Sequence, residues 1–126
     1  MSRYLLLLSF GFATFGLVLG IYMGISQNHA QLVAHAHLLL VGFLMSFVYA
    51  LCHRLWLGDL ITRLAKIQMV LHVLSALVLT AGLFMLYGQI FPGHVIGPVL
   101  GIASIGVFLA FLMMFWLLLK HPQARQ

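Results

Sequence analysis

The chain has 126 residues, of which 64% are hydrophobic and only 6% are charged. About a quarter of the residues in an ordinary soluble domain are charged, so these few charges cannot cover a surface that faces water. The composition excludes a soluble globular domain. The net charge of +5 is carried by basic residues that are dispersed along the chain, which argues against a nucleic-acid-binding surface.

Four stretches are long and apolar enough to cross a bilayer, whose hydrocarbon core of about 30 Å requires about 20 helical residues. They lie at about Tyr4–Ile25, Leu32–Trp56, Leu64–Tyr87 and Val95–Leu119. The first stretch is longer than the apolar core of a signal peptide, so we interpret it as a retained span. Asp59, between the second and third stretches, is expected to cap the third helix. The sequence predicts an all-α, polytopic four-helix bundle, with residues 1–126 forming one transmembrane domain.

The basic residues predict the orientation of the spans, because Lys and Arg accumulate in cytoplasmic loops. All six lie near span ends that share one side of the membrane if both termini are cytoplasmic: Arg3, Arg54, Arg63, Lys66, Lys120 and Arg125. The connections on the opposite side contain neither Lys nor Arg. We expect a multi-pass protein surrounded by membrane lipid, with both termini in the cytoplasm.

Two rows of glycines recur every four residues, in the first span at Gly16, Gly20 and Gly24, and near the start of the fourth at Gly93, Gly97 and Gly101. Small residues at this spacing let helix backbones approach closely in lipid. We expect both rows to serve packing within the chain rather than a contact between copies.

Seven histidines stand against a single acidic residue, and ionisable residues inside spans are usually functional. The predicted topology places His29, His35, His37 and His94 toward the outer face. His53, His72 and His121 lie toward the cytoplasm. We expect an interfacial role for His53, beside Arg54, and a solvated position for His121 in the tail.

The pair His35 and His37 is the most informative feature of the second span. Residues two apart on an α-helix point about 200° from each other, so one helix cannot direct both imidazoles at a single ion. This geometry suits a helix between two sites that each take one histidine. For a planar cofactor such as haem, the opposite axial ligand would come from another helix at similar depth.

The remaining histidines differ in depth. His72 lies about 14 Å deeper than His37 along the helices, too far for both to ligate one haem. We expect His72 to be a buried residue that is bonded to a carbonyl or hydroxyl, with ligation of a second, inner site as the alternative. By depth, His94 and His29 are better candidates for partners of the pair.

The run from His35 to Phe43, which reads HAHLLLVGF, is followed by Tyr49 and by His53–Leu55. It resembles small bacterial membrane proteins related to the catalytic subunit of haem-copper oxidases, in which the stretch is similar to HAHLNLLGW and ends in a YYR-like segment. The likeness covers about residues 31–89, and its specific part is the segment of histidines and glycine.

The resemblance implies a fold and a set of ligands. In the large oxidase subunit, the second helix carries a histidine ligand of the low-spin haem near its outer end, where His35 or His37 falls here. Another helix of that subunit has a His-x-His pair that serves two haems on opposite sides. Its twelve helices form three arcs of four helices, and this chain looks like one arc. We therefore expect a homo-oligomer, a trimer rather than a dimer, with haem b ligated between copies.

The chain departs from the oxidases at the copper site. It has neither the His-Pro-Glu segment nor the adjacent His-His pair of those enzymes, so the resemblance does not extend to oxygen reduction. Catalytic residues are not assigned. Candidate cofactor-binding residues are His35, His37, His72 and His94, and the pair His35 and His37 is also the candidate metal site.

Three functions are open at this point. The first is a b-type haem protein of the bacterial cytoplasmic (inner) membrane that transfers electrons, to or from a quinone or a respiratory redox partner, or that senses redox state, gas or haem. The second keeps the same histidines but binds copper or zinc, with His29 and His94 contributing. The third is a cofactor-free assembly or interaction subunit of a respiratory oxidase.

Overall fold

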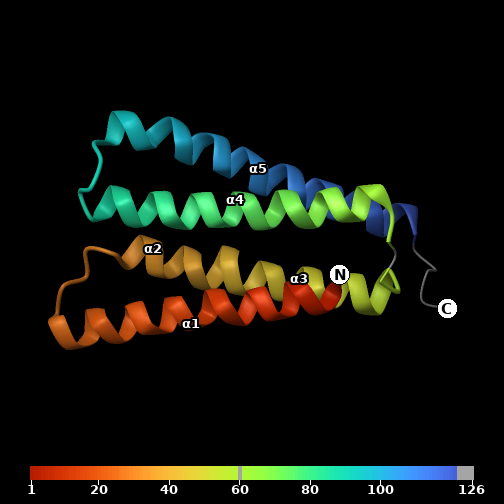
Figure 1. The fold of residues 1–126 in the computed structure, drawn as a ribbon, viewed down its shortest axis with the longest axis horizontal. Coiled ribbons are helices and arrows are strands. Elements are labelled where there is room, and N and C mark those ends of the chain that lie inside the picture. Colours follow the sequence, from red (N-terminus) through yellow and green to blue (C-terminus); the bar gives the residue numbers. More distant parts are fainter. Residues whose placement is uncertain (60, 122–126) are drawn as a thin grey trace.

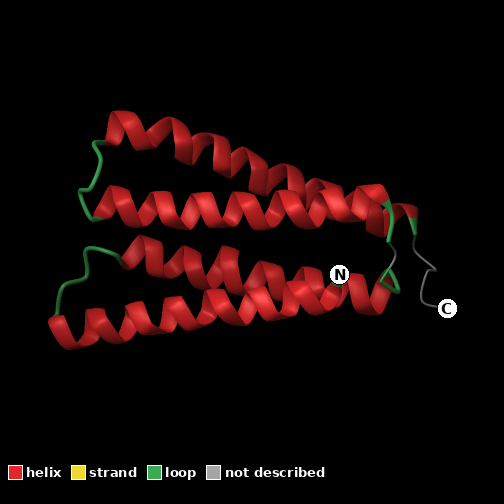
Figure 2. Ribbon diagram, in the orientation of Figure 1, coloured by secondary structure: helices red, strands yellow, loops and turns green. Residues whose placement is uncertain are grey.

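A computed structural model describes residues 1–59 and 61–121, and it consists of helices joined by short connections (Figure 1). The first crossing is α1 (Ser2–Ser26). The second is continuous and comprises α2 (Leu32–His37), η1 (Leu38–Met45), α3 (Ser46–Leu51) and η2 (Cys52–Trp56). The last two are α4 (Arg63–Tyr87) and α5 (Gly93–Lys120). Figure 2 shows no strand in the described part of the chain.

Each of the four crossings is long and apolar enough to span a membrane, which confirms the predicted set of spans. Their bounds differ from the predicted ones by at most two residues. The agreement has a simple cause, because apolar length fixes a span before any packing is considered.

The crossings run up and down in chain order. The second crossing packs against both α1 and α4, and α4 packs along α5. From the end that carries the N-terminus toward the other end, α1 diverges from the second crossing and α5 diverges from α4 (Figure 1). We call these the inner end and the outer end. Arg3, Arg63 and Lys66 lie in the first turns of α1 and α4, and Lys120 ends α5, so these four residues are at the inner end. Arg54 lies there too, in η2. Arg125 lies outside the described residues.

The interior has two apolar clusters. The inner cluster joins residues of all four crossings, including Leu5, Tyr49, Ala65 and Leu117. The outer cluster joins α2 to α4 and α5 around Ala34, Leu79, Leu83 and Ala103. Each side chain at the centre of these clusters is less than a tenth exposed.

The second crossing contains two π-helical stretches, η1 and η2, which the sequence did not predict. In a π-helix the backbone N–H bonds to the carbonyl five residues earlier, as Leu57 N does to Cys52 O at 2.9 Å. Such stretches are uncommon and often occur at functional sites. Here η1 begins directly after His37, so the backbone departs from regular α-helix at the histidine pair.

The expected cap of the third predicted span is wrong. Thr62 directly precedes α4, and its Oγ1 accepts a hydrogen bond from Ala65 N at 3.1 Å. Asp59 lies four positions before the helix and adopts a left-handed backbone with φ of 55°. Its carboxylate instead accepts hydrogen bonds from the N–H and the Oγ of Ser2, at 3.1 and 3.0 Å. Asp59 therefore caps α1 from across the bundle.

The two glycine rows behave differently. A Cβ atom on Gly16 would lie 2.9 Å from a methyl carbon of Leu39, and one on Gly20 would lie 2.9 Å from Cε1 of His35. The expected packing within the chain is confirmed at these two positions. A Cβ atom would meet nothing within 4 Å at Gly24 of the first row or at Gly97 and Gly101 of the second. The same expectation is therefore wrong at these three positions, and Gly97 and Gly101 lie on a face of α5 that the described residues leave open.

Candidate functional site

His35 lies at the outer end of the second crossing and faces α1. Its Nδ1 atom is 2.8 Å from the carbonyl oxygen of Gly16, and its ring lies over Gly20. A side chain at residue 20 would occupy the space of the imidazole, so the row of small residues on α1 makes room for His35. The imidazole is half-buried.

His37 is held by its own helix. Its Nδ1 atom is 2.9 Å from the carbonyl oxygen of Val33, four residues earlier in the chain. Like His35, it is half-buried. Thus α1 holds the imidazole of His35, and the second crossing itself holds that of His37. Positions two apart on a helix point about 200° from each other, so the two rings lie on different sides.

Both contacts define a tautomer. A carbonyl oxygen can only accept a hydrogen bond, so the neutral ring must carry its proton on Nδ1 and its lone pair on Nε2. Neither Nε2 atom has a hydrogen-bond partner in the described part of the chain. Metal-ligating histidines usually donate their second ring N–H to a carbonyl or carboxylate in this way. The donor set at His35 and His37 therefore fits a metal ion or a haem iron.

The described part of one copy does not gather three ligands around either histidine. Within residues 1–59 and 61–121, no group of three His, Cys, Asp or Glu side chains is close enough to hold a metal ion. The two Nε2 lone pairs also belong to rings on different sides of one helix. Within the described residues, the pair is therefore not part of a site with three such ligands.

His72 is fully buried on α4, and its Nε2 lies 2.8 Å from the hydroxyl oxygen of Ser46. This confirms the prediction of a buried histidine bonded to a hydroxyl. Ser46 follows His37 by nine residues, a separation of about 14 Å along a helix, so the structure does not bring His72 to the level of the pair. The ring of His72 also packs edge-on against Tyr49, with ring centroids 4.8 Å apart.

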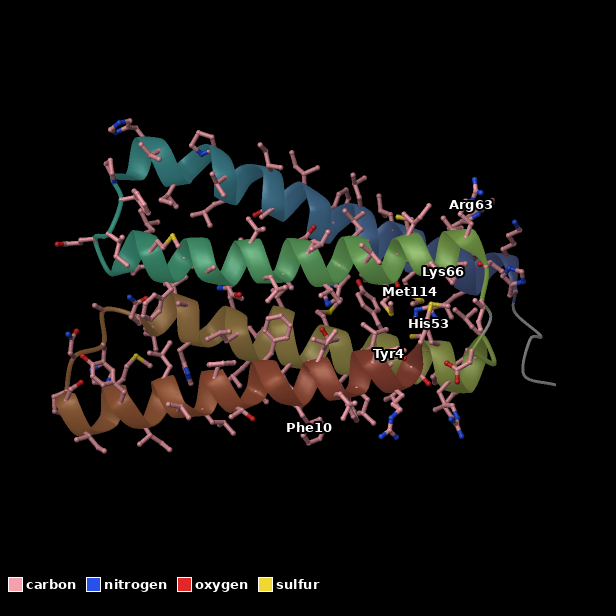
Figure 3. The ribbon with its side chains drawn as sticks, in the orientation of Figure 1. Tyr4, Phe10, His53, Arg63, Lys66 and Met114 are labelled. Carbon is pink, nitrogen blue, oxygen red and sulfur yellow. The ribbon has the colours of Figure 1, made fainter. Side chains whose placement is uncertain are left out.

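The expected interfacial position of His53 is wrong. Its side chain is completely buried, and its Nε2 donates to Oε1 of Gln68 at 3.2 Å. Figure 3 shows His53 between the helices, near the end that carries Arg63 and Lys66. His53 follows Tyr49 by four residues and so shares its helix face, which is directed at α4. The neighbouring Arg54 correctly indicated that His53 lies near the inner end of the bundle. It did not indicate that the side chain points into the interior.

These contacts form a continuous interior feature that sequence reasoning missed. We call it the polar seam: Ser46, Tyr49 and His53 of the second crossing, facing Gln68 and His72 of α4. Gln68 Nε2 also donates to Ala110 O of α5 at 3.3 Å. Three atoms of the seam are buried with no hydrogen-bond partner in the described residues, namely Tyr49 OH, His53 Nδ1 and His72 Nδ1. Polar residues recurring every three or four positions on two successive spans were the available signal.

The other histidines are not engaged by the described residues. His29 lies in the connection after α1, and His94 is the second residue of α5; both are exposed. Their ring nitrogens make no hydrogen bond in the described part of the chain. His94 is the second residue of α5. In the view of Figure 1, α4 lies between α2 and the start of α5, so α4 separates His94 from the helix that carries His35 and His37.

The chain was compared with known proteins. No family model matches it. No curated protein and no solved structure matches it either. None of these comparisons links the chain to haem-copper oxidases, so that resemblance stays an expectation from the sequence.

Proposed function

We propose that this chain is an integral-membrane b-type haem protein in which His35 and His37 are axial ligands. The observation that carries the proposal is the pair of Nδ1 contacts, to Gly16 O at 2.8 Å and to Val33 O at 2.9 Å. Each contact fixes the ring orientation and leaves the Nε2 lone pair for a metal. The other buried histidines differ, because the Nε2 atoms of His53 and His72 are already bonded to side chains.

The two ligands of one haem come from two copies of the chain. His35 and His37 leave their helix on different sides, so each haem takes His35 from one copy and His37 from the next. Such a head-to-tail contact closes into a ring under cyclic symmetry. We favour a trimer over a dimer, because the resemblance implies three arcs of four helices.

The proposed activity is electron transfer, to or from a quinone or a respiratory partner, or sensing of redox state, gas or haem. Haem iron would supply one-electron redox chemistry there. The chain's part is to hold each imidazole by its Nδ1 proton and to surround it with apolar side chains. The half-buried position of both rings leaves them accessible from the surface of one copy, as a contact between copies requires.

Haem titration of the purified protein in detergent tests the proposal. The wild type should develop a sharp Soret band that saturates, and His35→Ala and His37→Ala should each abolish it. His29→Ala and His94→Ala are matched controls, because these exposed histidines should leave the band unchanged. Absence of a Soret band in the wild type would overturn the proposal.

The same samples separate the two alternatives. Copper or zinc that co-purifies without haem, and is lost from both His35→Ala and His37→Ala, would favour a metal site between copies. A chain that retains neither haem nor metal, and whose stability is unchanged by both substitutions, would favour a cofactor-free assembly or interaction subunit.

We also propose that the inner end faces the cytoplasm of a bacterial inner membrane. The support is the position of Arg3, Arg63, Lys66 and Lys120 at that end, where cytoplasmic loops are basic. Single cysteines introduced into a Cys52→Ala background would test it in spheroplasts. A membrane-impermeant maleimide should label Ser26→Cys at the outer end and should spare Ile61→Cys at the inner end. The opposite labelling would contradict this orientation.

A further inference from the structure

A large cavity opens between α1 and α4 in the outer half of the bundle. Its volume is about 990 Å³, at the upper end of the range for small-molecule sites. The walls are mostly apolar and include Phe12, Phe15, Leu77 and Phe84. Because both helices cross the membrane, a ligand of this cavity would reach it from the bilayer.

The outer end of the cavity is polar. Asn28, Gln31, Tyr87 and Gln89 contribute to its lining there. Thr80 also lines it, but its hydroxyl already donates to Ala76 O at 2.8 Å. The cavity thus has one polar end, at the level of the membrane surface, and an apolar body that extends toward the middle of the bundle.

Gln31 distinguishes this polar end from an ordinary loop. Gln31 is only 8% exposed. Its Nε2 donates a hydrogen bond to Phe84 O at 2.9 Å. Its Oε1 is buried and has no hydrogen-bond partner in the described residues. An acceptor left in this state is costly, so a ligand that donates a hydrogen bond at this end would be favoured over one that only accepts.

The lining also restricts the charge of the ligand. It contains no Lys, Arg, Asp, Glu or His side chain. A charged head group would lose hydration without gaining a counter-charge, which is unfavourable in a low-dielectric region. The residues therefore fit an uncharged head.

We propose that this cavity binds an uncharged membrane amphiphile whose hydroxyl head group donates a hydrogen bond to Gln31 Oε1 and whose hydrocarbon tail packs against Phe12, Phe15 and Phe84. Two kinds of membrane molecule have this chemistry: a reduced quinone, that is a quinol, and a neutral lipid with a free glycerol hydroxyl. No histidine lines the cavity, so the inference does not depend on the proposed haem.

Binding to the full-length protein in nanodiscs tests the proposal, with empty nanodiscs as the blank. Three probes with ten-carbon chains are compared: decylubiquinol, decylubiquinone and 1-decanoylglycerol. The quinol and the quinone have the same tail, but only the quinol donates a hydrogen bond. If the natural ligand is a quinol, decylubiquinol should bind about tenfold more tightly than decylubiquinone, which is the effect of roughly one net hydrogen bond. If the natural ligand is a neutral lipid, 1-decanoylglycerol should bind saturably, and decylubiquinol should bind no more tightly than decylubiquinone.

Two substitutions decide whether the cavity is the site. Gln31→Leu should remove the preference for decylubiquinol, or the binding of 1-decanoylglycerol, whichever the wild type shows. Ala81→Phe should weaken the bound probe at least tenfold by filling the cavity that Ala81 lines. Leu74→Phe is the matched control, because Leu74 is exposed on α4 and does not line the cavity. The proposal is overturned if no probe binds above the blank, or if binding is the same in Gln31→Leu and in Ala81→Phe as in the wild type.

Discussion

The Nδ1 atom of His35 lies 2.8 Å from the carbonyl oxygen of Gly16. This contact is one of several between α1 and the second crossing, and it determines which nitrogen of the imidazole is free. The contact requires a glycine at position 20 of α1, because a Cβ atom there would lie 2.9 Å from Cε1 of His35. Glycine at this position therefore positions a candidate ligand as well as allowing close packing.

We predict that Gly20→Val displaces the imidazole of His35 and weakens haem binding about 10- to 100-fold, the usual effect of losing a residue that orients a ligand. Gly24→Val is the matched control, one helical turn away, where a Cβ atom would meet nothing within 4 Å. Haem titrations of the two variants provide the measurement. Equal affinities would show that the position of His35 does not depend on α1.

Asp59→Asn should destabilise the bundle at neutral pH, because the Asp59 carboxylate accepts two hydrogen bonds from Ser2 at the start of α1. Asparagine keeps one oxygen that can accept from Ser2 but removes the negative charge from the start of the helix, a loss of about 0.3–1 kcal/mol. Arg54 Nη1 also lies 3.9 Å from the carboxylate. Denaturant titration in detergent, followed by circular dichroism, would measure the change in the free energy of unfolding.

The effect of Asp59→Asn should depend on pH. Partial burial alone would raise the pKa of Asp59, but the hydrogen bonds from Ser2 and the positive charges of the N-terminus and Arg54 outweigh it and lower the pKa. A carboxyl group whose pKa is lowered by folding stabilises the folded state above its unfolded pKa, about 3.9, and loses this effect as the pH falls through the folded value. The difference between wild type and Asp59→Asn should therefore be full at pH 7 and shrink below about pH 4. A difference that is constant across this range would contradict the role of the carboxylate.

In the polar seam, Ser46→Ala should reduce the free energy of unfolding by about 1–3 kcal/mol, because it leaves Nε2 of the buried His72 without its partner. Thr14→Ala is the control, since Thr14 is exposed and its hydroxyl bonds within its own helix, to Phe10 O at 2.8 Å. The penalty should be smaller when Ser46→Ala is made in a His72→Phe background. An equal penalty in both backgrounds would mean that Ser46 and His72 are not energetically coupled.

On α5, Gly106→Ala should destabilise the protein and Gly97→Ala should not. A Cβ atom on Gly106 would overlap the side chain of Ser75, whereas one on Gly97 would meet nothing within 4 Å. Overpacking of this kind typically costs about 1–3 kcal/mol, so thermal melts should show a lower midpoint for Gly106→Ala only. Destabilisation by Gly97→Ala would place a partner on that open face of α5.

The sequence predicted the spans well and their internal contacts poorly, for physical reasons. Apolar length determines a crossing locally, so the helix bounds followed from composition. The hydrogen bonds of Asp59 involve Ser2, which is 57 residues away in the chain, and no local pattern indicates such a partner. The π-helical stretches of the second crossing likewise have the same hydropathy as an ordinary α-helix.

The histidines show the same division. Depth in the membrane followed from position along a span, so the separation of His72 from His37 was predicted. The direction in which a histidine side chain points depends on which helix packs against that face of its span. The sequence does not contain this information, so His53 was expected at the membrane interface rather than in the polar seam. The Nδ1 contact of His35 required the backbone of α1, although the angle between His35 and His37 followed from helix geometry alone.

The reduced-minus-oxidised visible spectrum of the haem-supplemented, purified protein, taken with the ratio of haem to chain, tests the central claim most directly. Ligation by His35 and His37 from neighbouring copies predicts a Soret band and split alpha bands of a low-spin b-type haem, at about one haem per chain. It also predicts that both features disappear in His35→Ala and in His37→Ala. A spectrum without a Soret band, or a haem signal that survives both substitutions, would contradict the account.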